Sequence, residues 1–405
     1  MGILLKNSFS FSFLFLFLTK LGGVYVQRIS IKQVREFALN EIKIGDQLLS
    51  LTDHRKKCEI TMPTLFDALL YTSILSKKSL LARDKLLRKD YSKYFFKSNR
   101  KMVASDSTLN RFLASNVETH ELEQINKRIF SWTENDLVNP VLKKRVGIFD
   151  GSFLSNFFKE VFFIPGKQDF IYSFNTIVKR GKELVSAQKL ISKLASDFPK
   201  GYFDLILGDG LYYSQHIFRQ CKKELNASVL VKTSERLNVV KEAELIIDGY
   251  RDEIESAQGY DTDRMIKYKI EVVKNIQAET IDDSIQVAVI TEKHNKGETE
   301  KFYVITNDLK LTPTEIRYAA HLRWRIENNG FKELSKLSGT KKKYLKNENC
   351  FTNLLWILII AFNLLICYLK KYQVLASLKI SKPQLQDIIE LFIETLILCP
   401  YIDSS

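Results

Sequence analysis

The segment from residue 146 to residue 231 constrains the fold more than any other part of the chain, because short strand patterns alternate there with helical patterns. In chain order, their ranges are 146–152, 170–178, 187–198, 202–207, 215–225 and 229–231. The first, second, fourth and sixth ranges have the apolar runs or alternation of strands, and the other two have helical spacing. The order of strands, helix, strand, helix and strand predicts an α/β fold with a partly parallel sheet.

Two of these predicted strands end in the same dipeptide, at Asp150-Gly151 and at Asp209-Gly210. Asp-Gly is common in turns, so a turn alone explains either one. Open α/β sheets, however, bind their ligands at the carboxyl ends of strands, where two such carboxylates converge. No G-x-G-x-x-G or G-x-x-x-x-G-K-[ST] motif follows either strand, which excludes the common nucleotide-binding loops.

A third carboxylate lies in the segment from Arg323 to Lys336, for which we predict a helix. Arg323 and Glu327 are four residues apart and share a helical face, beside Trp324. A solvated ion pair has the same spacing. If Asp150 and Asp209 converge nearby, the three carboxylates provide the hard oxygen ligands of a two-metal phosphoryl-transfer site.

The charge of the chain favours a polyanionic partner. Its 405 residues contain 61 Lys and Arg against 47 Asp and Glu, a net charge of +14, which indicates nucleic acid or an anionic membrane. The five cysteines contain no C-x-x-C and the five histidines no H-E-x-x-H, so neither a zinc site nor a disulfide framework is indicated. We therefore expect a reducing cytoplasm.

Two apolar runs raise the question of a membrane. Phe9 to Leu18 resembles a weak signal-peptide core, or else belongs to a disordered leader or a spurious upstream start. Leu354 to Leu369 spans 16 residues and includes Asn363, which favours a buried core helix over a membrane span.

The N-terminal third is mostly helical in pattern and contains a basic segment. Residues 77–101 hold ten Lys and Arg and two acids, interleaved with aromatic residues, namely Tyr91, Tyr94, Phe95 and Phe96. This composition suits a DNA-binding surface, and equally a solvated helix face with core aromatics.

The three acidic segments together resemble a known family. Phe149-Asp150-Gly151, Leu207 to Tyr212, and Arg323 to Leu334 are similar in sequence and order to segments of the bacterial DDE transposases of the insertion sequence 4 type. The aspartates are 59 residues apart, and Glu327 follows Asp209 by 118 residues, which leaves room for that family's β-rich insertion. The resemblance covers roughly residues 45–372.

The resemblance implies an RNase H-like mixed sheet flanked by helices and a cut-and-paste DNA reaction. It implies Asp150, Asp209 and Glu327 as catalytic residues and as ligands of two Mg²⁺ ions, with Mn²⁺ tolerated. For DNA binding it implies contacts from four side chains, namely Arg323, Trp324, Lys332 and Lys336. Double-stranded DNA, as terminal inverted repeats and target, is the implied partner of a homodimer in the synaptic complex.

The helix signature departs from the family at two positions. Ala320 stands where the family has tyrosine, and Leu334 where it has lysine. On a regular α-helix Lys336 lies about half a turn from Glu327, and Lys332 is no better placed. These departures leave open a decayed or repurposed transposase that binds DNA without cutting it.

The expected organisation has five parts. These are an apolar leader outside the fold (1–28), a helical DNA-binding domain (29–140), an RNase H-like catalytic domain (141–232 and 303–372), a β-rich insertion (233–302) and a C-terminal helical tail (373–405). We expect a bacterial, cytoplasmic, nucleoid-associated protein with no stable membrane partner. The alternative is a basic protein held at a membrane by its two apolar runs.

Overall fold

The computed structural model describes most of the chain outside its two ends. The described residues are 18–21, 24–27, 30–55, 59–89, 104–154, 157–177, 181–250, 254–278, 281–295, 297–338, 347–372 and 390. The aromatic part of the basic segment, nearly all of the predicted C-terminal tail and most of the apolar leader therefore lie outside them.

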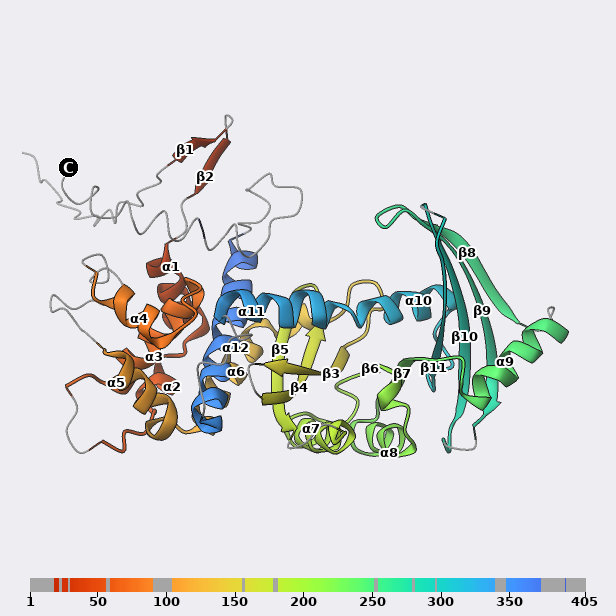
Figure 1. The fold of residues 1–405 in the computed structure, drawn as a ribbon, viewed down its shortest axis with the longest axis horizontal. Coiled ribbons are helices and arrows are strands. Elements are labelled where there is room, and N and C mark those ends of the chain that lie inside the picture. Colours follow the sequence, from red (N-terminus) through yellow and green to blue (C-terminus); the bar gives the residue numbers. More distant parts are fainter. Residues whose placement is uncertain are drawn as a thin grey trace, which may run out of the picture.

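A nine-stranded mixed sheet runs through the molecule (Figure 1). Its strands are β3 (Val146–Leu154), β4 (Phe157–Pro165), β5 (Asp169–Ile177), β6 (Leu205–Gly208), β7 (Ser228–Thr233), β8 (Glu255–Asp261), β9 (Ile266–Gln277), β10 (Ser284–His294) and β11 (Thr299–Thr306). They lie in the order β5-β4-β3-β6-β7-β11-β10-β9-β8, with β3, β6 and β7 parallel and the other pairs antiparallel. The first five strands form the RNase H-like core, so the expected fold class is confirmed.

Helices cover both faces of this core. The α-helices are α1 (Ile31–Glu36), α2 (Gly45–Leu49), α3 (Met62–Ile74), α4 (Leu80–Leu87), α5 (Asp106–Arg111), α6 (Thr119–Thr133), α7 (Glu183–Asp197), α8 (Gln215–Gln220), α9 (Asn238–Gly249), α10 (Pro313–Leu322), α11 (Lys332–Ser338) and α12 (Glu348–Lys371). Figure 1 shows α7 and α8 on one side of the core strands, with α10 and α11 running across the other side toward β8–β11. The helical N-terminal region contains α1 to α6.

Short π and 3-10 segments and one small hairpin complete the described fold. The π segments are η1 (Phe37–Ile42), η3 (Phe112–Asn116), η6 (Cys221–Leu225) and η8 (Ile326–Phe331), the 3-10 turns are η4 (Glu134–Leu137) and η5 (Gly210–Tyr212), and the hairpin is β1 (Leu18–Leu21) with β2 (Val24–Gln27). The segment η8 lies between α10 and α11.

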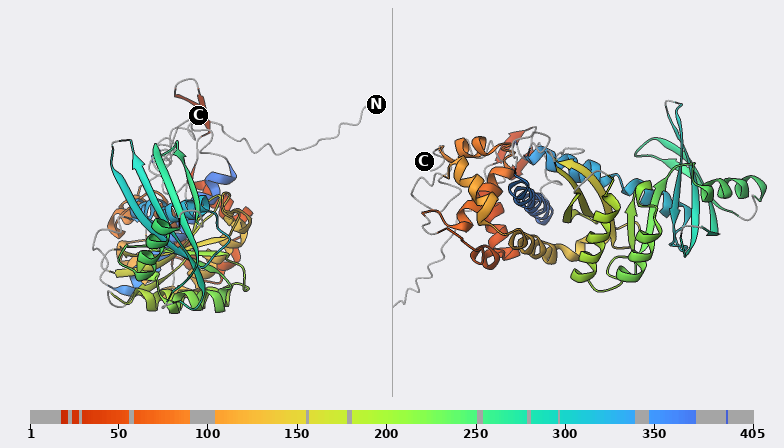
Figure 2. Two further views of the ribbon diagram at one scale, coloured as in Figure 1. Left: turned by 90° about the vertical axis from the view of Figure 1, so that its right-hand side faces the viewer. Right: turned by 60° about the horizontal axis from the view of Figure 1, so that its bottom comes forward.

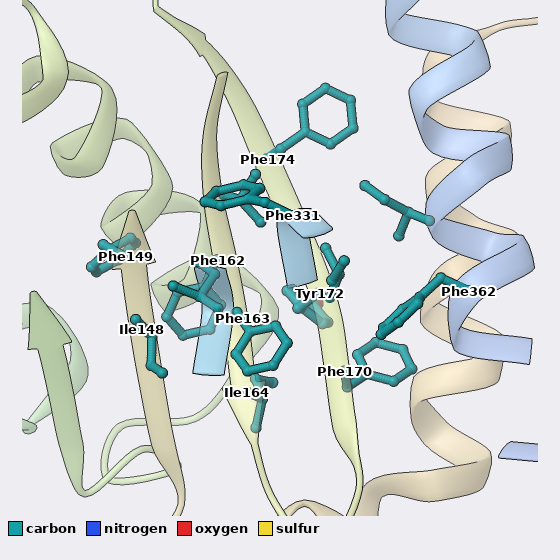
Figure 3. Close-up of a cluster of buried hydrophobic side chains, with 14 of the residues drawn as sticks. Ile148, Phe149, Phe162, Phe163, Ile164, Phe170, Tyr172, Phe174, Phe331 and Phe362 are labelled. Atoms are coloured by element: carbon teal, nitrogen blue, oxygen red, sulfur yellow. The ribbon is translucent and has the colours of Figure 1, made fainter. Parts of the chain in front are cut away.

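The apolar run at residues 354–369 forms the middle of α12, which is a core helix. Among the described residues α12 is the one helix long and apolar enough to cross a membrane, and 89% of its most apolar window is buried inside the protein. It packs against α3 and α6 on one side and β5 on the other (Figure 2). Figure 3 shows Phe362 of α12 beside Phe170 of β5.

Asn363 explains how a polar residue fits within this helix. The strand β5 is an edge of the sheet, so one row of its backbone groups lacks a strand partner. Asn363 accepts from the N–H of Ile171 at 3.0 Å and donates to the C=O of Ile171 and to Oδ1 of Asn126, both at 2.8 Å. Asn126 of α6 also donates to the C=O of Ile171 at 3.1 Å. The two asparagines therefore cap the sheet edge inside the core.

Four expectations for individual elements need correction. The strand β4 and the helix α9 were not predicted, and α9 adds a helix to residues 233–302. The strand β3 continues to Leu154 because it pairs with β4 beyond Asp150. The strand β6 begins only at Leu205, since the ring of Tyr202 turns away to stack on Phe198, with 4.4 Å between centroids.

Candidate active site

The register of two parallel strands brings Asp150 and Asp209 together. In the β3–β6 pair, Ile148 lies opposite Leu207. Two residues further along the chain are Asp150, still in β3, and Asp209, just past the end of β6, whose extended backbone places them level with each other on one face of the sheet. The 59-residue separation in the sequence is thus the offset of the strand register. Asp150 lies inside β3, but the parallel pairing ends just before it.

Local structure fixes Asp209 at the end of β6. Its Oδ1 accepts the N–H of Leu211 at 2.9 Å, so the side chain caps the short turn η5. Gly208 allows this turn, because a Cβ there would come within 2.7 Å of the Tyr212 ring. The chain therefore reverses directly after β6 and leaves the Asp209 carboxylate partly exposed at the strand end.

Glu327, the third carboxylate, comes from η8 rather than from the sheet. It is the second residue of η8, and its side chain is half exposed. Arg323 connects it to the sheet, with Nη2 donating to Oε1 of Glu327 at 3.0 Å and Nη1 lying 3.5 Å from Oδ2 of Asp150. The guanidinium is almost completely buried. The structure therefore places Asp150, Asp209, Glu327 and Arg323 in one cluster.

The electrostatics of Asp150 reflect this crowding. The pKa of Asp150 is raised to about 7, mainly by burial; Arg323 opposes the rise, and the charges of Asp209 and Glu327 add to it. A carboxylate that is repelled by two others gains most from a bound cation. Three carboxylates at one site are the oxygen-rich donor set that Mg²⁺ prefers, so these residues fit a divalent metal site.

A fourth acid, which the sequence analysis missed, lies under the site. Glu160 of β4 is fully buried on the face of the sheet opposite Asp150, where Tyr212 donates its hydroxyl to Oε1. Among the residues that the structure describes, none forms a hydrogen bond with its Oε2. Burial raises the pKa of Glu160 to about 8, and Asp150 and Asp209 contribute in the same direction. The signal in the sequence was the Lys159-Glu160 pair within the apolar run of β4.

Glu160 makes the stability of the protein depend on pH. The pKa of Glu160 in the folded state, about 8, lies above its ordinary value of 4.5, so the folded state holds more protons between these values and stability falls as pH rises through that window. We expect Glu160→Gln, which has no proton to lose, to melt close to wild type at pH 5 and at a higher temperature at pH 8.5. The difference corresponds to a few kcal/mol, on the order given by the shift.

Differential scanning fluorimetry from pH 5 to pH 9 measures this difference. Glu242→Gln at an exposed position is the matched control and should follow wild type throughout. Parallel melting curves for wild type and Glu160→Gln at all pH values would contradict the assignment of a buried, neutral Glu160.

The four side chains predicted to contact DNA have different positions. Arg323 is in the cluster. Trp324 is partly buried, with Nζ of Lys232 4.9 Å from its ring centroid and His321 against its edge. Lys332 is exposed at the start of α11, and the side chain of Lys336 lies outside the described residues. Trp324 therefore directly follows the clustered Arg323 in the chain, and Lys332 is accessible to solvent.

The π segment changes the geometry expected around Glu327. A π turn takes one residue more than an α turn, so residues after η8 are rotated back by about one position. The position seven residues after Glu327 is Leu334, which is fully buried. Lys332 consequently lies nearer to the face of Glu327 than a regular α-helix allows.

Three comparisons with known proteins bear on this site. The family described as "Transposase DDE domain" matches residues 156–364, just over half of the chain, including Asp209 and Glu327 and beginning just after Asp150. No curated protein sequence matches. Among solved structures, the chain is similar to a piggyBac transposase synaptic complex with hairpin DNA, with TM-score 0.41 and 11% identity over 89% of this chain and 78% of that chain.

Proposed function

Because the chain belongs to the transposase DDE domain family, we propose that it is a transposase that cuts the ends of a mobile DNA element and joins them to target DNA. The element proposed is a bacterial insertion sequence of the insertion sequence 4 type. The observation that carries the proposal is the shared register of Asp150 and Asp209 on one sheet face, with Glu327 linked to Asp150 by Arg323.

In this proposal the three carboxylates, Asp150, Asp209 and Glu327, hold two Mg²⁺ ions, and Mn²⁺ substitutes for them. When bound, the ions activate the attacking oxygen and stabilise the charge on the leaving oxygen of a phosphodiester. Two separate parts of the fold position the three carboxylates, namely the strand ends for Asp150 and Asp209 and η8 for Glu327. Glu327 is the most exposed of the three. DNA therefore approaches from the side of η8.

The neighbouring cations orient the DNA. Arg323 already lies between Asp150 and Glu327, and its planar guanidinium is suited to hold a phosphate next to them. Lys332, exposed at the start of α11, contacts a further phosphate, and Lys336 is a second phosphate contact in this proposal. Trp324 presents a partly buried ring on which a base turned out of the duplex stacks.

The basic composition supports DNA as the partner. The net charge of +14 favours a polyanion. We propose double-stranded DNA, both the terminal inverted repeats and the target, as the partner, a homodimer that brings two ends together, and a place on the nucleoid in the cytoplasm. The burial of α12 removes one of the two anchors that the membrane alternative requires.

Cleavage of a labelled duplex tests the proposal. The duplex carries the inverted repeats that flank the coding region, with adjoining host DNA, and is incubated with Mg²⁺, with Ca²⁺ or with EDTA. We expect strand cleavage at the repeat boundary with Mg²⁺, and joining of the freed 3′-hydroxyl to a plasmid. Salt-sensitive binding to the repeats without metal-dependent cleavage would instead favour a DNA-binding protein derived from a transposase. The alternative is motivated by Leu334, which stands where lysine is expected.

A further inference from the structure

The segment that carries Glu327 has a second attachment to the sheet, away from Arg323. Arg325 lies two residues before Glu327 and Asn329 two residues after it, and both contact Asp169. Nη2 of Arg325 lies 2.6 Å from Oδ1 of Asp169, and Nδ2 of Asn329 donates to Oδ2 at 2.7 Å. The carboxylate therefore has two partners around η8, an ion pair with Arg325 at the N-cap and a hydrogen bond from Asn329 within the segment.

Asp169 is buried in the protein core. It is the first residue of β5, it is 8% exposed, and it pairs across the strand with Pro165. Ile171, two residues along β5, lies opposite Phe163, whose ring a Cβ added at Gly330 of η8 would contact at 3.5 Å. Asp169 therefore lies on the sheet face that η8 covers, about four residues along β4 from the level of Asp150.

The two contacts control the direction of Glu327. Arg325 and Asn329 are four residues apart and lie on one side of the helical segment, while Glu327, midway between them, lies on roughly the opposite side. A π turn has a looser hydrogen-bond pattern than an α-helix and occurs most often as a single turn at functional sites. Contacts that fix Arg325 and Asn329 thus set the rotation of η8.

We propose that Asp169 is a positioning residue that holds η8 through Arg325 and Asn329 and thereby directs Glu327 toward Asp150 and Asp209. The inference rests on the proposed metal site and adds a residue from a third strand, β5, far in sequence from the Glu327 that it orients. Residues that orient metal ligands typically change metal affinity by about 10- to 100-fold when replaced. Asp169 acts in this way on Glu327 alone.

Mn²⁺ binding to the full chain tests the inference, by isothermal titration calorimetry without DNA. We expect Asp169→Asn to raise the Kd for Mn²⁺ by about tenfold or more. Asn329→Ala, which keeps the ion pair of Arg325 with Asp169, should have a smaller effect in the same direction. In a Glu327→Gln background, Asp169→Asn should change the Kd little further, because the ligand that it orients is already lost.

A matched control separates positioning from general damage to the fold. Asp308→Asn removes another buried carboxylate whose partner, Lys144, lies 2.7 Å away, and it should leave the Kd for Mn²⁺ unchanged. If Asp169→Asn weakens Mn²⁺ binding equally in the wild-type and Glu327→Gln backgrounds, or binds as tightly as wild type, the positioning role is wrong. Absence of Mn²⁺ binding to wild type would instead overturn the proposed metal site itself.

Discussion

Replacing Asp150, Asp209 or Glu327 by its amide should lower the rate of metal-dependent DNA cleavage by about a thousandfold or more in each case. The amide keeps the shape of the side chain but loses the charge that binds a divalent ion. Metal ions contribute several kcal/mol to the transition state, and each 1.36 kcal/mol corresponds to a factor of ten. Single-turnover cleavage of the end duplex under Mg²⁺ measures the three rates.

Binding and folding must be retained for this result to count. Each variant should bind the duplex within a few-fold of wild type, since the phosphate contacts come from basic side chains. Asp248→Asn, at an exposed position of α9, removes the same charge without approaching the site and should cleave at the wild-type rate. A folded Asp209→Asn variant that cleaves as fast as wild type would exclude Asp209 from the site.

Asn363→Leu should lower the free energy of unfolding by about 2–6 kcal/mol. Leucine has a similar size, but it leaves the N–H of Ile171 and Oδ1 of Asn126 without the partners they have at 3.0 and 2.8 Å. Each unsatisfied buried group costs about 1–3 kcal/mol. The C=O of Ile171 keeps its bond from Asn126, which limits the loss to these two groups.

Urea denaturation followed by circular dichroism measures this loss. Ile366→Leu, at a partly buried position on the same helix, keeps the apolar volume and breaks no hydrogen bond, so it should change stability by less than about 1.5 kcal/mol. If Asn363→Leu were as stable as wild type, α12 would not cap the edge of β5 as described.

The core strands and the convergence of the carboxylates could largely be predicted from the sequence. The strand at Val146 was found from its apolar run, and Asp150 and Asp209 follow strand residues that turned out to be paired in register. The alternation of strands and helices was enough for the α/β class. The 16-residue length of the apolar run at 354–369, with Asn363 in it, predicted a core helix, and α12 is one.

The support around the site could not be predicted in the same way. The charged pair of Lys159 and Glu160 masked the strand β4, and nothing local indicates that Glu160 lies beneath Asp150. The π turn at η8 has no signal in the apolar pattern, and its contacts through Arg325 and Asn329 reach Asp169, which lies 160 residues from Asn329 in the sequence. Sequence periodicity therefore misplaced Lys332 relative to Glu327.

The number of Mn²⁺ ions bound per chain in the complex with end DNA tests the central claim most directly. Electron paramagnetic resonance counts free and bound Mn²⁺ at known protein concentration. A two-metal site predicts about two bound ions for wild type and a loss of binding in Asp150→Asn. Equal numbers of bound ions in wild type and in the Asp150, Asp209 and Glu327 variants would contradict the account.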